Sequence, residues 1–215
     1  MSRAPSLCAV ILAAGESTRM GRDKALLPWP PPIPGAEFSP ETFLSAAIRT
    51  LNPFNDMVIV VVGKNEKNLA PIIYASGGSL VRNPAPERGQ LSSLQTGLQE
   101  VLNLGRDAAT VTLVDRPPVA PSTLRTLHAA FEGAVNQGKW AVVPEYEGKH
   151  GHPFLIGREM IEAFLQADAT SMARDIEHQH QPYVEYVAID DPFIALNVDT
   201  PEQYAALSKL QIHSD

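Results

Sequence analysis

The residues best suited to chemistry lie in one glycine-rich stretch near the start of the chain. Leu12-Ala13-Ala14-Gly15 ends an apolar run, and Ser17, Arg19 and Lys24 follow it. Small side chains let an anionic ligand approach the backbone, whose successive N–H groups can hold phosphate oxygens. Arginine suits forked contact with phosphate, whereas lysine acts as a flexible point charge on the group under attack. The stretch therefore predicts a nucleotide-binding loop in which Arg19 and Lys24 are catalytic.

The spacing of this loop excludes two common nucleotide-binding motifs. A Walker loop requires G-x-x-x-x-G-K-[ST], whereas here Gly15 is followed by Gly21 and then, after two further residues, by Lys24. The dinucleotide fingerprint G-x-G-x-x-G is also absent from the sequence. The remaining alternative is an ordinary turn between a strand and a helix, with solvated basic residues. The combination of two alanines, glycine, serine, arginine and lysine favours the phosphate-binding interpretation.

Two aspartates follow apolar runs and are the candidate metal ligands. Asp115 follows residues 111–114 and Asp199 follows residues 195–198, and each has a proline two positions later. Because proline prevents a strand from continuing inside a sheet, both carboxylates are expected at carboxyl ends of strands, on the same edge as the glycine-rich loop. Mg²⁺, or Mn²⁺ in its place, is held at nucleotide sites by one or two carboxylates and phosphate oxygens. For Asp199 alone, a turn or helix-cap role is an equal alternative.

Two further segments could contact substrates. Asn83, Gly89, Ser92 and Ser93 lie in a loop that enters an expected helix, where N–H and hydroxyl donors could meet a base or ribose, although helix capping is the simpler role for the serines. The second segment is Gly148-Lys149-His150-Gly151-His152-Pro153. Its two histidines lack a third soft ligand nearby, so we interpret it as a turn instead of a metal site.

The composition of the 215-residue chain limits its partners. The formal net charge is −7, which argues against a broad nucleic-acid-binding face because such faces depend on clustered Lys and Arg. No apolar run reaches the roughly 18 residues needed to span a bilayer, so we expect no membrane partner and a cytoplasmic location. The single cysteine, Cys8, lies in an apolar run and is expected to be a small core residue.

Apolar β-branched runs alternate with stretches of helical spacing, which is typical of βα units around a mostly parallel sheet. We expect a single α/β domain over residues 1–215, with a proline-rich surface loop at about residues 28–40. Helix starts are expected after Ser39 and Thr200, each followed by proline. Residues 145–158 could be an excursion from the main sheet. The expected strands span residues 7–12, 57–62, 111–114, 140–143 and 183–189. The expected helices span residues 40–51, 66–76, 91–102, 121–137, 158–167, 171–178 and 201–210.

The motif L-A-A-G-x-S-x-R-M-G-x-x-K, read from residues 12–24, resembles the signature loop of the MobA-like nucleotidyltransferases. That family includes molybdenum cofactor cytidylyltransferases and guanylyltransferases, and the loop is shared more loosely with sugar-phosphate and methylerythritol cytidylyltransferases. The resemblance extends through most of the chain. It implies a Rossmann-like three-layer αβα sandwich of the nucleotide-diphospho-sugar transferase type.

The resemblance also implies roles for individual residues. Asp115 falls at the family's metal-binding Asp-x-Pro, and Asp199 matches its late Asp-[TS]-Pro-Glu. Asn83, Gly89, Ser92 and Ser93 match its N…G-x-x-S-S-L-x-x-G stretch, which contacts the nucleoside. Gly151, His152 and Pro153 are similar to the acceptor-side G-x-x-G-H-P segment of the cytidylyltransferase branch. Arg116 departs from the usual residue between Asp and Pro, so it either contacts the acceptor or has no role there.

The activity implied by the resemblance is magnesium-dependent transfer of a nucleoside monophosphate from a triphosphate, CTP ahead of GTP, to a phosphorylated acceptor such as molybdopterin. Pyrophosphate is released, and a molybdoenzyme or chaperone would be a protein partner. One alternative is a sugar-phosphate or methylerythritol-phosphate acceptor. Another is a nucleotide sensor of the same fold without catalysis, which the joint presence of Lys24, Asp115 and Asp199 disfavours.

Overall fold

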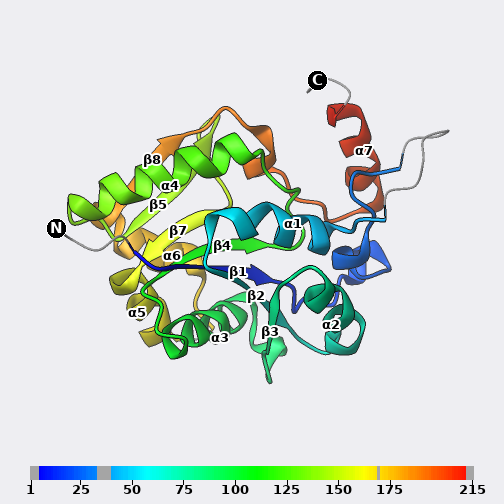
Figure 1. The fold of residues 1–215 in the computed structure, drawn as a ribbon, viewed down its shortest axis with the longest axis horizontal. Helices are drawn as coiled ribbons and strands as arrows, with labels where there is room; N and C mark the ends of the chain where they lie inside the picture. The colour runs from blue at the N-terminus through cyan, green and yellow to red at the C-terminus, as the bar shows by residue number, and fades with distance from the viewer. Residues whose placement is uncertain (1–4, 33–39, 169, 212–215) are drawn as a thin grey trace.

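A computed structural model of the protein describes residues 5–32, 40–168 and 170–211 and shows a sheet between layers of helices (Figure 1). The eight strands form one sheet in the order β3-β2-β1-β4-β7-β5-β6, with β8 paired to β5. All neighbouring strands are parallel except at β7 and at the β5–β6 hairpin. The strands are β1 (Leu7–Leu12), β2 (Met57–Val62), β3 (Ser79–Arg82), β4 (Ala108–Leu113), β5 (Ala141–Tyr146), β6 (Lys149–His150), β7 (Phe154–Gly157) and β8 (Val184–Ala188).

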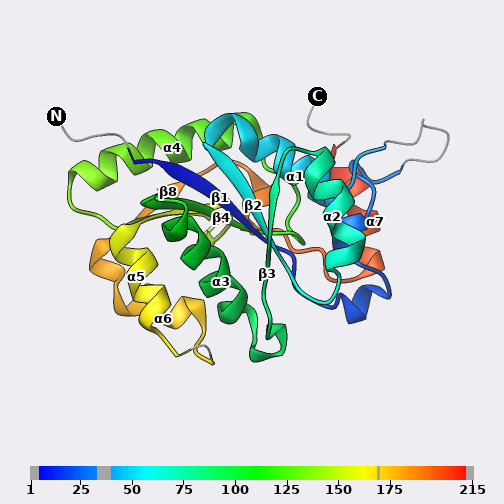
Figure 2. The same ribbon diagram turned by 60° about the horizontal axis from the view of Figure 1, so that its bottom comes forward.

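Helices cover both faces of the sheet because the central strands are apolar on both sides. In β1, Ala9 and Ile11 face one layer while Cys8, Val10 and Leu12 face the other. The helices α1 (Phe43–Leu51), α2 (Glu66–Ala75) and α4 (Pro121–Asn136) pack on the first face. The helices α3 (Gln90–Asn103), α5 (Arg158–Gln166) and α6 (Ala173–Gln179) pack on the second, which comes forward in Figure 2. This arrangement confirms the predicted three-layer α/β sandwich.

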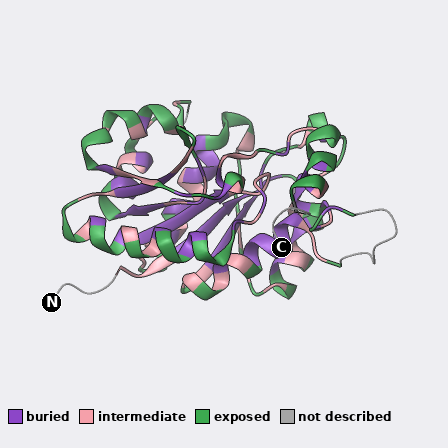
Figure 3. Ribbon diagram, turned by 90° about the horizontal axis from the view of Figure 1, so that it is seen from above, coloured by how far each residue is buried: buried purple, intermediate pink, exposed green. Residues whose placement is uncertain are grey.

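The strands are the most deeply buried part of the molecule, and the exposed residues lie on the outer faces of the helices (Figure 3). Cys8 has no exposed surface, as expected for a core residue, and burial raises the pKa of its thiol to about 12. Within the described residues, no helix is long and apolar enough to cross a membrane.

A third apolar cluster lies beyond the carboxyl ends of the parallel strands, where α7 (Pro201–Gln211) packs beside α1. Trp29 is buried in this cluster, with its ring 5.0 Å from that of Phe43 and 6.2 Å from that of Phe193. Pro28 pairs with Thr42 in an isolated bridge. The start of the proline-rich segment is therefore anchored by Trp29, while Pro30 and Pro32 are exposed. Residues 33–39 lie outside the described residues, so the surface loop over residues 28–40 stays a prediction.

Three sequence-based expectations about elements are wrong. Residues 145–158 are no excursion, because β7 lies at the centre of the sheet between β4 and β5. Residues 195–198 do not form a strand; a 3₁₀ turn over Pro192–Ala195 leads into an extended loop. The cap of α1 is Thr42, whose hydroxyl accepts from Ser45 N at 3.1 Å. The expected cap at Ser39 lies outside the described residues.

Candidate active site

The glycine-rich loop leaves β1 at the edge of the sheet and is held by an asparagine from the next βα connection. Ala13 N donates to Val61 O at 2.8 Å, which continues the β1–β2 pairing by one residue. Asn65 Nδ2 then donates to Ala13 O at 2.9 Å and to Asp23 Oδ2 at 2.8 Å. Asn65 thus joins both ends of the loop. Our sequence analysis missed it, because its only local signal is an ordinary asparagine after a strand.

A left-handed residue turns the loop back toward the sheet. Ser17 has φ 52°, and its hydroxyl accepts from Lys24 N at 3.2 Å. Asp23 caps the 3₁₀ turn over Lys24–Leu26 by accepting from Ala25 N. These contacts fix the backbone at Lys24, so its side chain points inward and is only 10% exposed.

Lys24 meets both candidate metal ligands. Its ammonium lies 3.2 Å from Asp115 Oδ2 and 2.5 Å from Asp199 Oδ1, although the three residues are far apart in the sequence. Arg19 adds a second cation, with Nη2 3.1 Å from Asp199 Oδ1, but its side chain is largely exposed. The hydrogen bond from Lys24 is the main cause that holds the pKa of Asp199 below its usual range, with the charges of Lys24 and the nearby arginines acting the same way. Both carboxylates and both catalytic candidates therefore meet at one point.

The two aspartates suit a divalent cation. A single ammonium contacts both carboxylates, which shows that one cation can be shared between them. Asp115 Oδ1 is buried and has no hydrogen-bond partner in the described part of the chain. A bound cation would satisfy this oxygen. Among the described residues, no group of three or more His, Cys, Asp or Glu side chains is arranged so that it could hold a metal ion. Two carboxylates fit a magnesium or manganese site completed by phosphate oxygens and water.

Asp199 reaches this point from a loop. Val198 N donates to Asp115 O at 2.9 Å, which ties the loop to the end of β4. Arg116 Nη1 donates to Ile194 O at 3.2 Å and to Leu196 O at 3.3 Å. Arg116 therefore fastens the segment that carries Asp199, a role that its position between Asp115 and Pro117 did not reveal.

The glycine-rich loop and the start of α3 enclose a cavity of about 300 Å³, which we call the small cavity. Predicted residues in its wall come from the loop, from α3 and from the end of β4. They are Leu12, Ala14, Gly15, Ser17, Lys24, Gly89, Ser93 and Asp115. Pro86, Gln90, Leu113 and Val114 complete it and were not predicted. Ala13 and Arg19 lie outside this lining, so their predicted contacts with a nucleotide stay predictions, and Asp199 also lies outside it.

Two of the predicted nucleoside-binding residues line neither cavity. Asn83 is 3% exposed, and its Nδ2 donates to Ser92 Oγ at 2.9 Å and to Ser93 Oγ at 3.0 Å. Ser92 Oγ in turn donates to Gly89 O at 2.7 Å. Asn83 and Ser92 thus join the end of β3 to the start of α3. Gly89 has φ 105°, in the left-handed region that favours glycine, and it directs the chain into the helix.

A second cavity of about 800 Å³, the large cavity, lies beside the first and shares Leu12, Gly89, Gln90 and Leu113 with it. Gly151 and His152 line it, whereas Pro153 does not. His152 N donates to Ile194 O at 2.9 Å, and a Cβ atom at position 151 would overlap that same oxygen. The predicted acceptor-side segment therefore also supports the loop that carries Asp199.

The large cavity is basic. Arg88, Arg116, Lys149 and Arg174 all line it. Burial, and to a lesser degree the charge of Arg116, lowers the pKa of His152 to about 3, so this imidazole is neutral near pH 7. His152 Nδ1 is buried without a hydrogen-bond partner in the described part of the chain.

A glycine-rich loop beside a lysine-bridged pair of carboxylates, at the carboxyl edge of a mostly parallel sheet, is the arrangement expected of an enzyme that transfers part of a nucleotide. The chain belongs to the MobA-like NTP transferase domain family, whose model matches residues 9–183. It is a nucleotidyltransferase family enzyme, as the sequence predicted.

The chain is similar to known proteins over nearly its whole length. It is 27% identical to the molybdenum cofactor cytidylyltransferase of Escherichia coli, over 91% of this chain and 92% of that protein. It is 28% identical to a "Probable molybdenum cofactor guanylyltransferase" of Mycobacterium avium, over 97% and 98%. The crystal structure of Rv0371c from Mycobacterium tuberculosis superposes with a TM-score of 0.78 at 26% identity, over 97% of this chain and 100% of that one. Rv0371c has also been solved in complex with manganese.

Proposed function

We propose that this enzyme transfers a nucleoside monophosphate from CTP, or else GTP, to the phosphate of a molybdopterin-type acceptor and releases pyrophosphate. The observation that carries the proposal is the contact of Lys24, in the wall of the small cavity, with both Asp115 and Asp199. The similarity to a cytidylyltransferase and a guanylyltransferase of the molybdenum cofactor supports the choice of acceptor.

In the proposed reaction, an acceptor phosphate oxygen attacks the α-phosphorus in line with the bond to the β-phosphate. A new P–O bond forms, and the bond to pyrophosphate breaks. Asp115 and Asp199 would hold the divalent cation, which when bound neutralises phosphate charge. Lys24, Arg19 and the amides of the glycine-rich loop stabilise the charge that grows on the phosphoryl oxygens. Because the acceptor attacks directly, the proposed reaction needs no covalent nucleophile from the protein, and catalysis consists of positioning and electrostatics.

The two cavities suggest a division of substrates. The small cavity is formed by the phosphate-binding loop and Asp115 and is the proposed nucleotide site. The large cavity adjoins it, is wider and contains four basic residues, which suits an acceptor that carries phosphate. Cytosine is the proposed base because Gly151-His152-Pro153 is similar to the segment of the cytidylyltransferase branch. A molybdoenzyme or chaperone that receives the product remains a prediction.

The test is pyrophosphate release from CTP, GTP and ATP, each measured with and without molybdopterin and with Mg²⁺ or Mn²⁺. Turnover should require both acceptor and metal and should be fastest with CTP. Asp115→Asn and Asp199→Asn should each weaken Mn²⁺ binding, measured by titration calorimetry, about 10-fold or more. Asp190→Asn, at an exposed position, is the control. Turnover on a sugar 1-phosphate or methylerythritol phosphate but not on molybdopterin would replace the proposal with the alternative acceptor.

A further inference from the structure

One acidic residue stands out in the large cavity. Among the described residues that line it, four are basic and Glu177, on α6, is the only carboxylate. A carboxylate placed in a cavity that attracts anions opposes the field of its neighbours. It is therefore expected to meet hydrogen-bond donors, either from the protein or from a ligand.

The protein satisfies one oxygen of this carboxylate. Tyr186, on β8, donates its hydroxyl to Glu177 Oε1 at 3.0 Å, and His150 Nδ1 lies 3.4 Å from the same oxygen. The rings of His150 and Tyr186 stack with centroids 4.2 Å apart. Burial and the charge of Glu177 raise the pKa of Tyr186 to about 12, so its hydroxyl keeps its proton near neutral pH. Two elements of the sheet thus fix the position of the Glu177 side chain.

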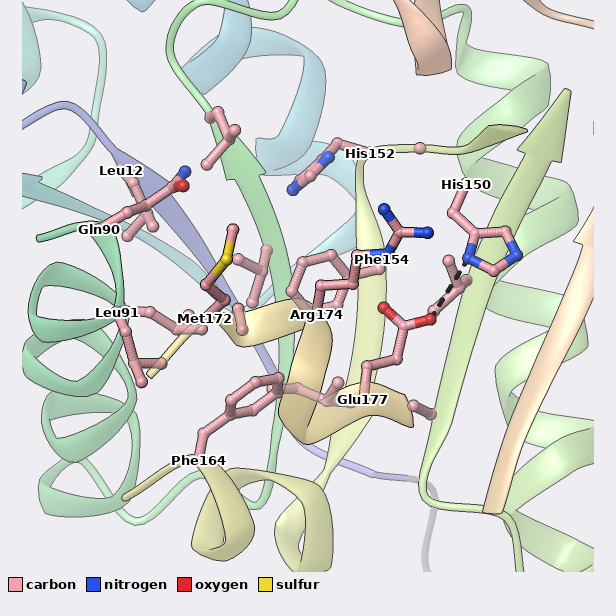
Figure 4. Close-up of a pocket in the computed structure, with 18 of the residues that line it drawn as sticks. Leu12, Gln90, Leu91, His150, His152, Phe154, Phe164, Met172, Arg174 and Glu177 are labelled. Atoms are coloured by element: carbon pink, nitrogen blue, oxygen red, sulfur yellow. Dashed lines mark ion pairs between the residues drawn. The ribbon is translucent and has the colours of Figure 1, made fainter. Parts of the chain in front are cut away.

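The other oxygen faces the cavity. In the close-up, Oε1 points to His150 along the dashed line, and the second oxygen of Glu177 points toward the space beside Phe154 and Arg174 (Figure 4). Within the described part of the chain, Oε2 has no hydrogen-bond or salt-bridge partner. The side chain of Glu177 is 21% exposed, so a ligand in the cavity can reach it.

The walls near Glu177 suit a flat aromatic group. Phe154, Phe164 and Met172 line this part of the cavity, and Met172 is 66% exposed. An apolar wall with one fixed carboxylate at its end favours a planar heterocycle that carries adjacent N–H donors on one edge. The cavity extends from this wall to Arg116, next to Asp115, so a ligand with the heterocycle here can place its phosphate near the metal-binding aspartates.

We infer that Glu177 is the specificity-determining residue for the acceptor, and that its free oxygen accepts from the 2-amino and ring N–H groups of a 2-amino-4-oxo pterin. The inference rests on the proposed function, because it assigns one edge of the proposed acceptor to one side chain. Tyr186 and His150 are positioning residues for that side chain.

The test compares two small probes, 6-hydroxymethylpterin and the corresponding lumazine, in which an oxo group replaces the 2-amino group. Binding is followed by ligand fluorescence. Because one hydrogen bond to a charged group is worth about tenfold or more in affinity, the unaltered protein should prefer the pterin by at least about 10-fold. Glu177→Gln should reduce the preference to within about twofold, since its amide can also donate to the lumazine oxygen. Glu162→Gln, on the exposed face of α5, should leave it unchanged.

Tyr186→Phe provides a second variant, which removes the hydroxyl donor but keeps the ring and the carboxylate. It should lower the preference less than Glu177→Gln does. Absence of a preference in the unaltered protein, whether both probes bind or neither does, overturns the inference. The inference is also overturned if the Glu177→Gln variant folds and binds CTP normally and still prefers the pterin over the lumazine as strongly as the unaltered protein does.

Transfer to intact molybdopterin separates this inference from the proposed function. If Glu177→Gln raises the KM for molybdopterin and leaves that for CTP unchanged, both stand. If the unaltered enzyme transfers to molybdopterin and Glu177→Gln does so with the same KM, only the inference fails. If no transfer to molybdopterin occurs under any metal and triphosphate, the proposed function fails, and the probe preference still decides the role of Glu177.

Discussion

The small and large cavities differ in how their charged groups are balanced. Lys24 and Asp115 line the small cavity. Beside it, Lys24 and Arg19 are paired with Asp115 and Asp199 at distances of 2.5 to 3.2 Å. At the large cavity, the three arginines and one lysine in the lining form no salt bridge with any residue in the described ranges. One site therefore has its charged groups paired with one another, and the other has four basic side chains against the single carboxylate of Glu177 in its described lining.

This difference indicates what each site does before substrates arrive. Groups that already hold one another lose little freedom at the moment of reaction, which is the condition for electrostatic catalysis. Unpaired cations attract an anionic ligand and can adjust to it, which favours binding and selection over reaction. Substitutions in the small cavity should thus lower kcat, and those in the large cavity should raise the KM for the acceptor.

The largest effect is expected for Lys24→Ala. Loss of a fixed charge that stabilises the reacting phosphoryl group should reduce kcat about 100-fold or more. Lys64→Ala is the matched control, because Lys64 pairs with Glu16 on the exposed side of the same loop. Steady-state pyrophosphate release with CTP measures both. A folded Lys24→Ala variant with normal kcat would contradict the catalytic role.

The second-largest effect is expected for Arg116→Met, which removes both hydrogen bonds to the loop that carries Asp199. Because hydrogen bonds to a charged group contribute about 1.5–3 kcal/mol, the free energy of unfolding should fall by about 2 kcal/mol. Affinity for Mn²⁺ should fall with it. Arg116→Lys keeps the positive charge but lacks the forked guanidinium group. Its free energy of unfolding, measured by urea denaturation, should lie between those of the unaltered protein and Arg116→Met. Unchanged stability and metal affinity would leave Arg116 as an acceptor contact alone.

A smaller effect is expected on the acceptor side. The double variant Lys149→Ala/Arg174→Ala should raise the KM for molybdopterin about tenfold, because both charges are exposed and partly screened. The KM for CTP and the kcat should change little. Arg125→Ala, on the outer surface of α4, serves as the control. A fall in kcat with no change in acceptor KM would break the proposed division between the cavities.

The smallest effect concerns pH. The pKa of His152 is about 3, below its usual 6.5, so between these values the unfolded chain binds a proton that the folded protein does not. Stability must then fall as the pH decreases through this window, by about 1 kcal/mol per pH unit. His152→Asn should show a weaker fall between pH 7 and pH 5 in urea denaturation. Equal slopes for the two proteins would show that His152 is not buried as a neutral ring.

The part of the site that the sequence predicted is the part formed at ends of parallel strands. The glycine-rich loop follows β1 and Asp115 follows β4, and these neighbouring strands end at the same edge. The apolar periodicity predicted the two strands and the shared edge, and the structure adds that the strands are neighbours. The meeting with Asp199 was predicted for a wrong reason, since no strand precedes it and Arg116 and Asp115 hold its loop through backbone carbonyls.

The parts that sequence analysis missed depend on contacts between distant elements. β7 is short, and nothing in Phe154–Gly157 encodes that it runs antiparallel between β4 and β5. Glu177 lies on α6 among polar residues, so its sequence context resembles a solvated helix. Only the packing of α6 near β6 and β8 brings it to Tyr186 and His150.

The reversed direction of β7 has a consequence for how this enzyme can diverge. Phe154 pairs with Val111 near the end of β4, so the residues that precede β7, instead of those that follow it, open at the reactive edge. The connection between β5 and β7, residues 147–153, contains β6 and enters at this edge, far in the sequence from the glycine-rich loop. Under the proposed division of substrates, insertions or exchanges in this connection would change which acceptor is admitted and leave the triphosphate chemistry intact. Position 151 would have to stay glycine, because a Cβ atom there would overlap Ile194 O.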